Sequence, residues 1–239
     1  KLAESLDGIN GLELLADYIL LDNEEKRRFS QNSHEYLIEQ VQYSNKINLG
    51  SHTITNSSSK EIINITELLF NHPVKELIWT INQSNLGSNG ITQACSLENN
   101  GGNQNIQSNK VLLQFNGEDR FTKRDGKFFT KIQRYAHHSG AGINLTRIGV
   151  GSSDVSSELV TSKWYPLVCN THIYSFSLNP EEHQPSGTCN FSRLDKPMIH
   201  NTFSTPPING TYNYNINIFA TNYNMLKIAD GMAGLAYSE

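Results

Sequence analysis

Alternation of apolar and polar side chains is the feature of this sequence that most restricts its fold. In YNYNINIFA (residues 212–220), Tyr212, Tyr214, Ile216 and Ile218 are separated by asparagines. Successive side chains of a β-strand point to opposite faces, whereas an α-helix would spread these residues around its axis. The segment therefore predicts a strand with one buried, apolar face and one polar face.

The same period of two recurs along most of the chain. In VKELIWTINQ, for example, Leu77, Trp79 and Ile81 would share one face. The further segments are residues 35–49, where Tyr36, Ile38 and Gln40 alternate with Leu37, Glu39 and Val41; KEIINITELLF; KVLLQFN, with Val111, Leu113 and Phe115 on one face; and THIYSFSLN, with Tyr174, Phe176 and Leu178 on one face and Ser175 and Ser177 on the other. Each segment predicts an extended, half-buried strand.

The N-terminal part predicts a strand and then a short helix. LLADYILLD, residues 14–22, is apolar and is interpreted as a short strand that ends at Asp22. In DNEEKRRFSQN, Asp22 can cap a helix and Glu25 follows three residues later, as in a capping box. The basic residues of this segment lie toward its C-terminal end, where the helix dipole favours cations. One or two helical turns are expected here.

A second helix is expected in DGKFFTKIQRYAHHSG, residues 125–140. Phe128, Ile132 and Tyr135 follow the i, i+4, i+7 spacing, so they are predicted to form its buried side, and Gly140 can end the helix. Many short strands, long Gly/Asn/Ser-rich loops and one or two short helices predict an all-β fold. The expected architecture is an antiparallel sandwich of the jelly-roll kind.

Composition narrows the class of protein. The chain has 239 residues, 37% of them hydrophobic, which is enough for a substantial core. A net charge of -4 argues against attraction of the whole surface to nucleic acid or an anionic membrane. No apolar run approaches the roughly 18 to 20 residues of a membrane span, so a soluble protein is expected. Lys1 and the absence of a signal-peptide pattern suggest a piece of something longer.

The three cysteines are Cys95, Cys169 and Cys189. Their odd number and wide spacing fit reduced thiols in a cytosol-like compartment better than a disulfide framework. One disulfide pair remains possible among them.

The segment EEHQPSGTCNFSRLD, residues 181–195, concentrates reactive side chains. Glu181 and Glu182 could be a glycosidase pair, but adjacent residues near a strand end point to opposite faces, and that chemistry needs both carboxyls beside one bond. Solvated or salt-bridged loop carboxylates are the alternative. The two glutamates are therefore expected to be structural.

Zinc binding and thiol catalysis are the other possible chemistries of this segment. His183 and Cys189 could bind zinc, with His137, His138 or another cysteine added, but the paired ligand spacing of structural zinc sites is missing. The adjacent histidines are expected to divide into one packed and one exposed side chain that interacts with the end of the helix. Cys189 as a nucleophile, with Arg193 lowering its pKa and His183 as base, competes with a small buried thiol on a strand shared with Phe191.

The QPSG sequence offers a structural explanation for the same segment. Pro185 suits the second position of a turn and Gly187 the fourth, so the loop could reverse the chain between IYSFSLN and TCNFSRL. A loop of this kind needs no catalytic role.

A basic and aromatic segment, DRFTKRDGKFFTK, raises the question of nucleic-acid binding. Basic residues among aromatic rings can bind single strands. Asp119 and Asp125 dilute the charge, however, so a solvated face or a subunit contact is the preferred interpretation. The basic residues are Arg120, Lys123, Arg124, Lys127 and Lys131.

Several stretches together resemble one protein family. They are IYSFSLNP followed by EEHQPSGTCNFSRLD, and DYILLDNEEKRRFSQNSHEYLIEQVQ, NHPVKELIWTIN, NGEDRFTKRDGKFFTKIQRYAHHSG and IFATNYNMLKIADGMAGLAYSE. They run in the expected order over nearly the whole chain. The sequence is similar to the major capsid proteins of nucleocytoplasmic large DNA viruses, the group that includes iridoviruses, phycodnaviruses and their giant relatives.

This resemblance implies a double jelly-roll subunit whose trimers form pseudo-hexagonal capsomers of an icosahedral shell. Residues 1–34 would hold the end of the first jelly roll and a connecting helix, and residues 35–239 the second jelly roll. The implied partners are two further copies, neighbouring capsomers and minor capsid proteins, with no direct contact to nucleic acid and at most an indirect one to an inner viral membrane. The implied location is the virion shell, assembled in the host cytoplasm.

No enzymatic activity, catalytic residue, cofactor or metal is expected for such a subunit. Two other functions remain as alternatives. A carbohydrate-binding, lectin-like sandwich is suggested by the tyrosines of residues 212–223, and a Cys/His hydrolase by Cys189 and His183.

Overall fold

The computed structural model describes residues 15–56, 58, 60–83, 95–97, 108–139, 145–148, 163–169, 171–205 and 210–237. Its helices are α1 (Asn23–Gln31), the π-helix η2 (Phe128–Ile132), α2 (Gln133–His137) and the 3-10 helix η3 (Phe191–Arg193). Its strands are β1 (His34–Ile54), β2 (Glu61–Glu67), β3 (Pro73–Gln83), β4 (Cys95–Leu97), β5 (Ser108–Phe115), β6 (Glu118–Asp119), β7 (Arg124–Asp125), β8 (Leu145–Ile148), β9 (Lys163–Cys169), β10 (His172–Ser175), β11 (Cys189–Asn190), β12 (Met198–Ser204), β13 (Gly210–Ala229) and β14 (Met232–Leu235).

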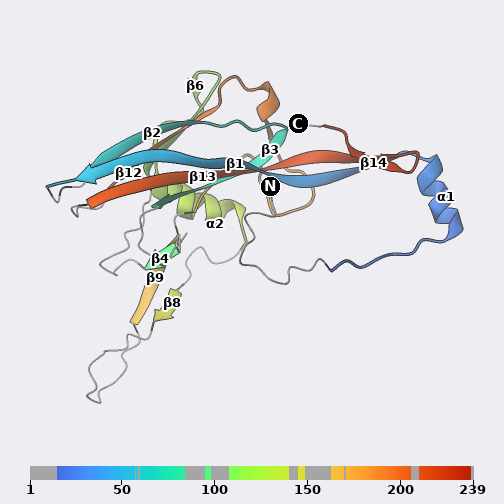
Figure 1. The fold of residues 1–239 in the computed structure, drawn as a ribbon, viewed down its shortest axis with the longest axis horizontal. Coiled ribbons are helices and arrows are strands. Elements are labelled where there is room, and N and C mark those ends of the chain that lie inside the picture. Colours follow the sequence, from blue (N-terminus) through green and yellow to red (C-terminus); the bar gives the residue numbers. More distant parts are fainter. Residues whose placement is uncertain are drawn as a thin grey trace, which may run out of the picture. The chain divides into compact units, whose positions relative to one another are not determined.

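Two antiparallel sheets make up most of the fold. The first has the order β1–β13–β3–β10, with β11 also paired to β3 and β14 to β13. The second has the order β2–β12–β5–β6, with β7 also paired to β5. Several neighbours, such as β1 and β13 or β2 and β12, are distant in sequence, as in the crossed connections of Greek-key and jelly-roll folds. Figure 1 shows the longest pair, β1 and β13, lying side by side. The all-β jelly-roll prediction is confirmed.

The core lies where the apolar faces of these two sheets meet. Trp79 of β3 and Ile218 of β13 are fully buried from the first sheet, and Leu113 of β5 and Phe203 of β12 from the second. The rings of Phe203 and Tyr214 pack across the sheets with centroids 5.2 Å apart. Sandwich sheets interdigitate their inner side chains in this way, so the alternation seen in the sequence decides which residues form the core.

The predicted rows of apolar residues are largely confirmed. Leu77, Trp79 and Ile81 are all fully buried, as are Tyr214, Ile216 and Ile218 of β13. The prediction that Tyr174, Phe176 and Leu178 share one face of a strand is only partly correct, because β10 ends at Ser175. Leu178 lies beyond that end, and 70% of its surface is exposed.

The segment before the first helix departs from the prediction. Residues 15–22 form no strand, and Leu15, Tyr18, Ile19 and Leu20 have exposed fractions between 86% and 92%. Helix α1 is present as expected, and the Asp22 carboxylate accepts a hydrogen bond of 2.8 Å from Glu25 N. This cap satisfies one of the backbone donors that every helix start leaves unpaired.

The second helix is present, but the residues on its buried side differ from the prediction. Phe129, Thr130 and Gln133 are buried, whereas Ile132 and Tyr135 are 56% and 84% exposed. The reason is the π-helical turn, in which Gln133 N bonds Phe128 O. That extra residue in the turn rotates the later side chains away from the expected face.

The end of this helix also differs from the prediction. The chain leaves the helix at His138, which has an extended backbone conformation. Gly140, the predicted end, lies outside the described residues.

A small third sheet contains β4, β9 and β8 in that order. Its register pairs Cys95 with Cys169. The side chains of both lie outside the described part, so the possible disulfide pair stays a prediction.

The chain divides into two compact units. One contains Lys1–Tyr36 and Leu226–Ala236, and the other Leu37–Met225 and Tyr237–Glu239. Both large sheets have their core in the second unit. Among the described residues, no helix is long and apolar enough to cross a membrane.

Candidate functional site

Residues 176–188 form a loop that leaves one edge of β3 and returns to the same edge. β10 pairs antiparallel to β3 up to Ser175 opposite Glu76, and β11 resumes the pairing with Cys189 opposite Val74. Both strands therefore run in the same direction, so the predicted chain reversal is wrong. The loop is an excursion with closely spaced ends, an arrangement typical of Ω-loops.

The first half of this loop is held by Lys75. Phe176 N and Ser177 N both donate to Lys75 O, at 2.9 and 3.2 Å. The Lys75 side chain is buried, and its Nζ donates to Pro180 O at 2.7 Å and pairs with Glu39 Oε1 at 2.6 Å. A buried ammonium needs such partners, and here one of them is the backbone of the loop.

The turn within the loop depends on Ser186 and Gly187. Asn179 N donates to Ser186 Oγ at 2.9 Å, and the hydroxyls of Ser177 and Ser186 share a hydrogen bond of 2.5 Å. Gly187 has φ of 145°, and a Cβ there would lie 2.8 Å from Phe176 O. The QPSG sequence is therefore structural, as expected, although the turn does not reverse the strand direction.

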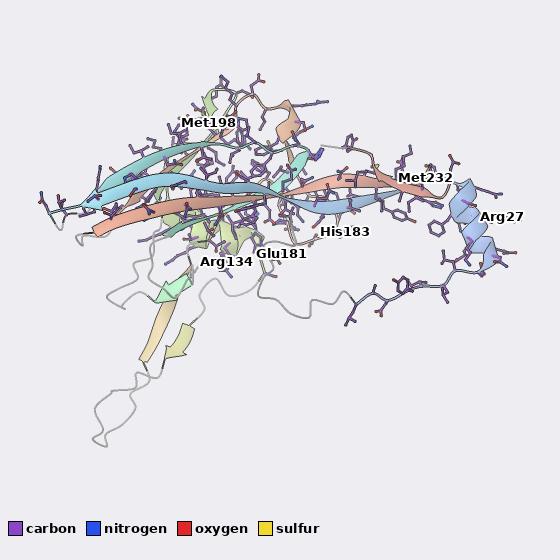
Figure 2. All side chains as sticks on the ribbon, in the orientation of Figure 1. Arg27, Arg134, Glu181, His183, Met198 and Met232 are labelled. Carbon is purple, nitrogen blue, oxygen red and sulfur yellow. The ribbon has the colours of Figure 1, made fainter. Side chains whose placement is uncertain are left out.

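Glu181 is a bound carboxylate, while Glu182 and His183 are exposed. Glu181 Oε2 accepts hydrogen bonds from Ser139 N at 2.9 Å and from Ser139 Oγ, and Oε1 lies 3.2 Å from His138 Nδ1. The bonds from Ser139 are the main reason that the pKa of Glu181 is below its ordinary value. Figure 2 labels Glu181 and His183 on this loop. The glutamates thus agree with the salt-bridged alternative and not with a glycosidase pair.

The two adjacent histidines do not divide as predicted. Both are partly buried, and both contact the loop instead of the end of their own helix. His137 Nδ1 lies 2.9 Å from Leu178 O, and His138 contacts Glu181. Among the described residues, no group of three or more His, Cys, Asp or Glu side chains could hold a metal ion.

Cys189 is a poor candidate for a nucleophile. Its side chain is partly buried against the core, and this burial raises the pKa of the thiol, an effect that Arg120 opposes but does not cancel. A catalytic thiol needs the opposite shift. The predicted small buried thiol is supported, although the strand ends at Asn190 and Phe191 begins the 3-10 helix.

The remainder of the 181–195 segment is tied to two distant turns. His72 N donates to Ser192 Oγ at 2.9 Å, and Phe191 N donates to His72 O at 3.0 Å. Asp195 N donates to Asn116 Oδ1 at 2.7 Å. Sequence reasoning missed these partners because they lie 79 and 120 residues away.

The basic segment around η2 is mostly exposed. Arg124 lies over the ring of Phe128, 4.7 Å from its centroid, and Asp125 accepts a bond from Lys127 N. Both phenylalanines at the start of the helix turn away from solvent, with Phe129 buried against Trp79 and Phe128 partly buried. The rings are therefore not free to stack on bases, which supports a solvated face or a subunit contact.

An apolar face on the outer side of the second sheet is the most distinct exposed surface. Ile63, Ile65 and Leu69 have exposed fractions of 66%, 56% and 79%. In the register, Ile63 and Ile65 lie opposite Thr202 and His200 of β12. Among the described strands, β2 pairs with β12 alone, so this face lies beside a sheet edge. We call Ile63, Ile65 and Leu69 the β2 face.

The described tyrosine side chains of β13 are buried and do not form an exposed surface. Tyr214 is fully buried and Tyr223 is 5% exposed, so neither ring is available to a sugar. The side chain of Tyr212 lies outside the described part. The observation that suggested a lectin thus loses its support.

Comparison with known proteins gives one consistent family. The family model described as large eukaryotic DNA virus major capsid protein matches residues 25–144 and 159–234. The major capsid protein of Pyramimonas orientalis virus is 38% identical over 234 residues, which cover 96% of this chain and 50% of that protein. That of Paramecium bursaria Chlorella virus 1 is 33% identical, over 95% of this chain and 54% of that protein.

Solved structures agree with these relatives. A quasi-atomic model of the PBCV-1 virus capsid matches 93% of this chain and 56% of its own chain, with 30% identity and a TM-score of 0.59. The crystal structure of PBCV-1 VP54 matches with 29% identity and a TM-score of 0.62, over 93% of this chain and 56% of its own. The chain thus spans about half the length of the proteins that it matches.

Proposed function

The chain belongs to the large eukaryotic DNA virus major capsid protein family, and from this premise we propose that its full-length protein is a structural subunit of a virion shell. The match of the family model over most of the chain is the observation that carries this proposal. The resemblance seen in the sequence is confirmed by it. Relatives that match nearly the whole chain are named as major capsid proteins, and none of those compared above is a lectin or a hydrolase.

Shell formation needs copies of one surface that fit each other, because closed assemblies arise from a repeated contact. The fold suits this role, since a core between two sheets makes a stiff unit and the 181–195 segment is held at several points. A structural subunit needs no activated nucleophile. The raised pKa of Cys189 agrees with this, because it disfavours the reactive thiolate.

The first jelly roll would precede this chain in the full-length protein. We propose that residues 1–34 hold its end and the connecting helix, and that residues 35–239 are the second jelly roll. The exposed apolar side chains at Leu15, Tyr18, Ile19 and Leu20 support this division, because monomeric proteins rarely expose contiguous apolar surface and such surface often marks a protein contact. The missing partner would be the preceding half of the same protein.

A homotrimer is the proposed assembly, and we propose that the β2 face contacts a second copy. Interfaces have apolar centres with polar rims, and here Glu61 and Glu67 flank Ile63 and Ile65 along the same side of β2. Neighbouring capsomers and minor capsid proteins would contact other surfaces. Assembly would take place in the host cytoplasm, where reduced cysteines are expected, and contact with an inner membrane would be indirect.

The β2 face can be tested in the full-length protein by replacing Ile63 and Ile65 with glutamate. The wild type is expected to give trimers in light scattering, and the double variant monomers, because two charges would be buried without partners. Val41→Glu is the matched control, since Val41 on β1 has the same exposed fraction, 66%, as Ile63.

The outcomes of this test distinguish the proposed contact through the β2 face from the proposed capsid function. Trimers that persist in the double variant would place the contact elsewhere and leave the capsid proposal intact. A wild-type protein that stays monomeric and is missing from particles would contradict the capsid proposal itself.

A further inference from the structure

A histidine behind the 176–188 loop lies between two carboxylates from different parts of the fold. His138 Nε2 lies 3.2 Å from Glu76 Oε2 of β3, and His138 Nδ1 lies 3.2 Å from Glu181 Oε1 of the loop. The side chains of His138 and Glu76 are 14% and 10% exposed, against 44% for Glu181. The imidazole therefore connects the loop to a nearly buried carboxylate of the sheet.

The other charged groups around this cluster have partners of their own. Lys75 pairs with Glu39 and lies over the ring of Tyr223, 5.6 Å from its centroid. Burial, with smaller effects of Glu39 and Glu76, raises the pKa of Tyr223, so this phenol is neutral in ordinary buffers. His137 contacts the carbonyl oxygen of Leu178.

The Glu76 carboxylate contacts one neutral side chain and one side chain that can carry a positive charge. Its Oε1 accepts a bond of 3.2 Å from Thr221 Oγ1. The cation placed against Oε2 is the His138 ring when that ring is protonated.

The number of protons on the His138 ring decides whether it can donate to both carboxylates or to only one of them. A neutral imidazole carries a proton on one nitrogen, whereas an imidazolium donates from both. Glu76 Oε2 and His138 Nε2 are buried and form no hydrogen bond among the described residues, and their contact meets the distance but not the geometry of a hydrogen bond. A protonated imidazole would offset the burial of this pair by charge attraction, which a neutral ring does not supply.

We propose that His138 is a pH-dependent latch that holds the 176–188 loop against β3 when its imidazole is protonated. The sign follows from the two carboxylates: while they are ionised, a charged ring attracts both of them, and this attraction is absent when the ring is neutral. The bond from Lys75 to Pro180 does not depend on this proton. When the contacts of His138 weaken, the loop therefore becomes more mobile around residues 178–182, while the bond from Lys75 still holds it to β3.

Hydrogen exchange of the full-length protein tests the latch. Protection factors of the amides in 176–182, corrected for intrinsic exchange, would be compared across the interval from about pH 5 to 8 in which histidine ordinarily titrates. Wild type is expected to lose protection on the order of threefold to tenfold as the pH rises, the range for a partly exposed charged pair. His138→Gln keeps a polar side chain without the charge, so its protection should stay low and independent of pH.

Two further variants make the result decisive. His137→Gln is the matched control, because His137 contacts the same loop but has no carboxylate partner among the described residues, and it should keep the pH response. Glu76→Gln should remove the response, and it carries the test if His138→Gln does not fold. Wild-type protection that does not change with pH, or a response that survives in His138→Gln or disappears in His137→Gln, would overturn the latch. The latch belongs to the fold and does not rest on trimer assembly.

Discussion

At the scale of single residues, Gly187 allows the 176–188 loop to return to β3 past Phe176. Its φ of 145° lies in the region that side chains avoid, and a Cβ would meet the backbone oxygen of Phe176 at 2.8 Å. Backbone atoms cannot move aside as the end of a flexible side chain can. Glycine is therefore required at this position by both conformation and space.

We expect Gly187→Ala to lower the free energy of unfolding by about 1 to 3 kcal/mol, the cost of a strained backbone conformation. Denaturant unfolding of the full-length protein would measure the change. Gly234→Ala is the control, because nothing lies within 4 Å of a Cβ there and its φ is ordinary. Equal stability of Gly187→Ala and wild type would show that the loop can shift to make room.

Cys189 should react slowly with alkylating reagents. Burial raises the pKa of its thiol, so less thiolate is present at any pH below that value than in a free cysteine. The rate of iodoacetamide modification of this residue, followed by mass spectrometry, should rise with pH later than that of a cysteine peptide. A rate above that of the peptide at neutral pH would revive the nucleophile hypothesis.

The hydrogen bonds from Ser139 should hold Glu181 ionised in acid. A carboxylate whose pKa is lowered by folding stabilises the folded protein at any pH above its pKa in the unfolded chain. This stabilisation is lost as the pH falls through the lower pKa of the folded protein. We therefore expect the Ser139 amide to stay protected from exchange at pH values somewhat below about 4.3, the ordinary value for glutamate. The Glu181→Ala variant has no acceptor for the Ser139 amide and should lack this protection at all pH values, and unchanged protection in it would contradict the role of Glu181.

At the scale of elements, alternation predicted several of the strands and their buried faces. Leu77, Trp79 and Ile81 of β3 and Tyr214, Ile216 and Ile218 of β13 are buried as predicted. The π-helical turn could not be predicted, because an i, i+4, i+7 pattern assumes an ordinary α-helix. The wrong orientation of Ile132 and Tyr135 follows from that one extra residue.

The course of the loop could not be predicted for another reason. Proline and glycine indicate a turn, but they do not reveal which strand the chain returns to. Lys75, Glu76 and Ser139, which hold the loop, are far from it in sequence and belong to no recognisable motif. The composition of the 181–195 segment was thus visible, while its partners were not.

The two faces of the sheets should respond differently to truncation. Ile218→Ala removes buried methyl groups from the core, so we expect a loss of about 2 to 5 kcal/mol in unfolding free energy. Ile63→Ala removes exposed surface and should change it by less than about 1 kcal/mol. Chemical denaturation of both variants would measure this, and similar losses would mean that the sheet face at Ile63 is covered within the subunit.

At the scale of the whole molecule, the described part of the chain combines a sandwich with exposed apolar side chains. The exposed residues 15–20 and the β2 face are of this kind, and monomeric proteins seldom leave large apolar patches in water. Together with the family match, they support the proposal that the full-length protein works by contact with further protein surfaces. Its function would reside in the shape of those contacts and not in a reaction.

Electron microscopy of the purified full-length protein tests this account most directly. We predict three-fold symmetric particles with pseudo-hexagonal outlines, each subunit containing two sandwiches, of which the second matches the fold of this chain. Single, unassociated subunits at every concentration, together with the absence of the protein from virus particles, would contradict it.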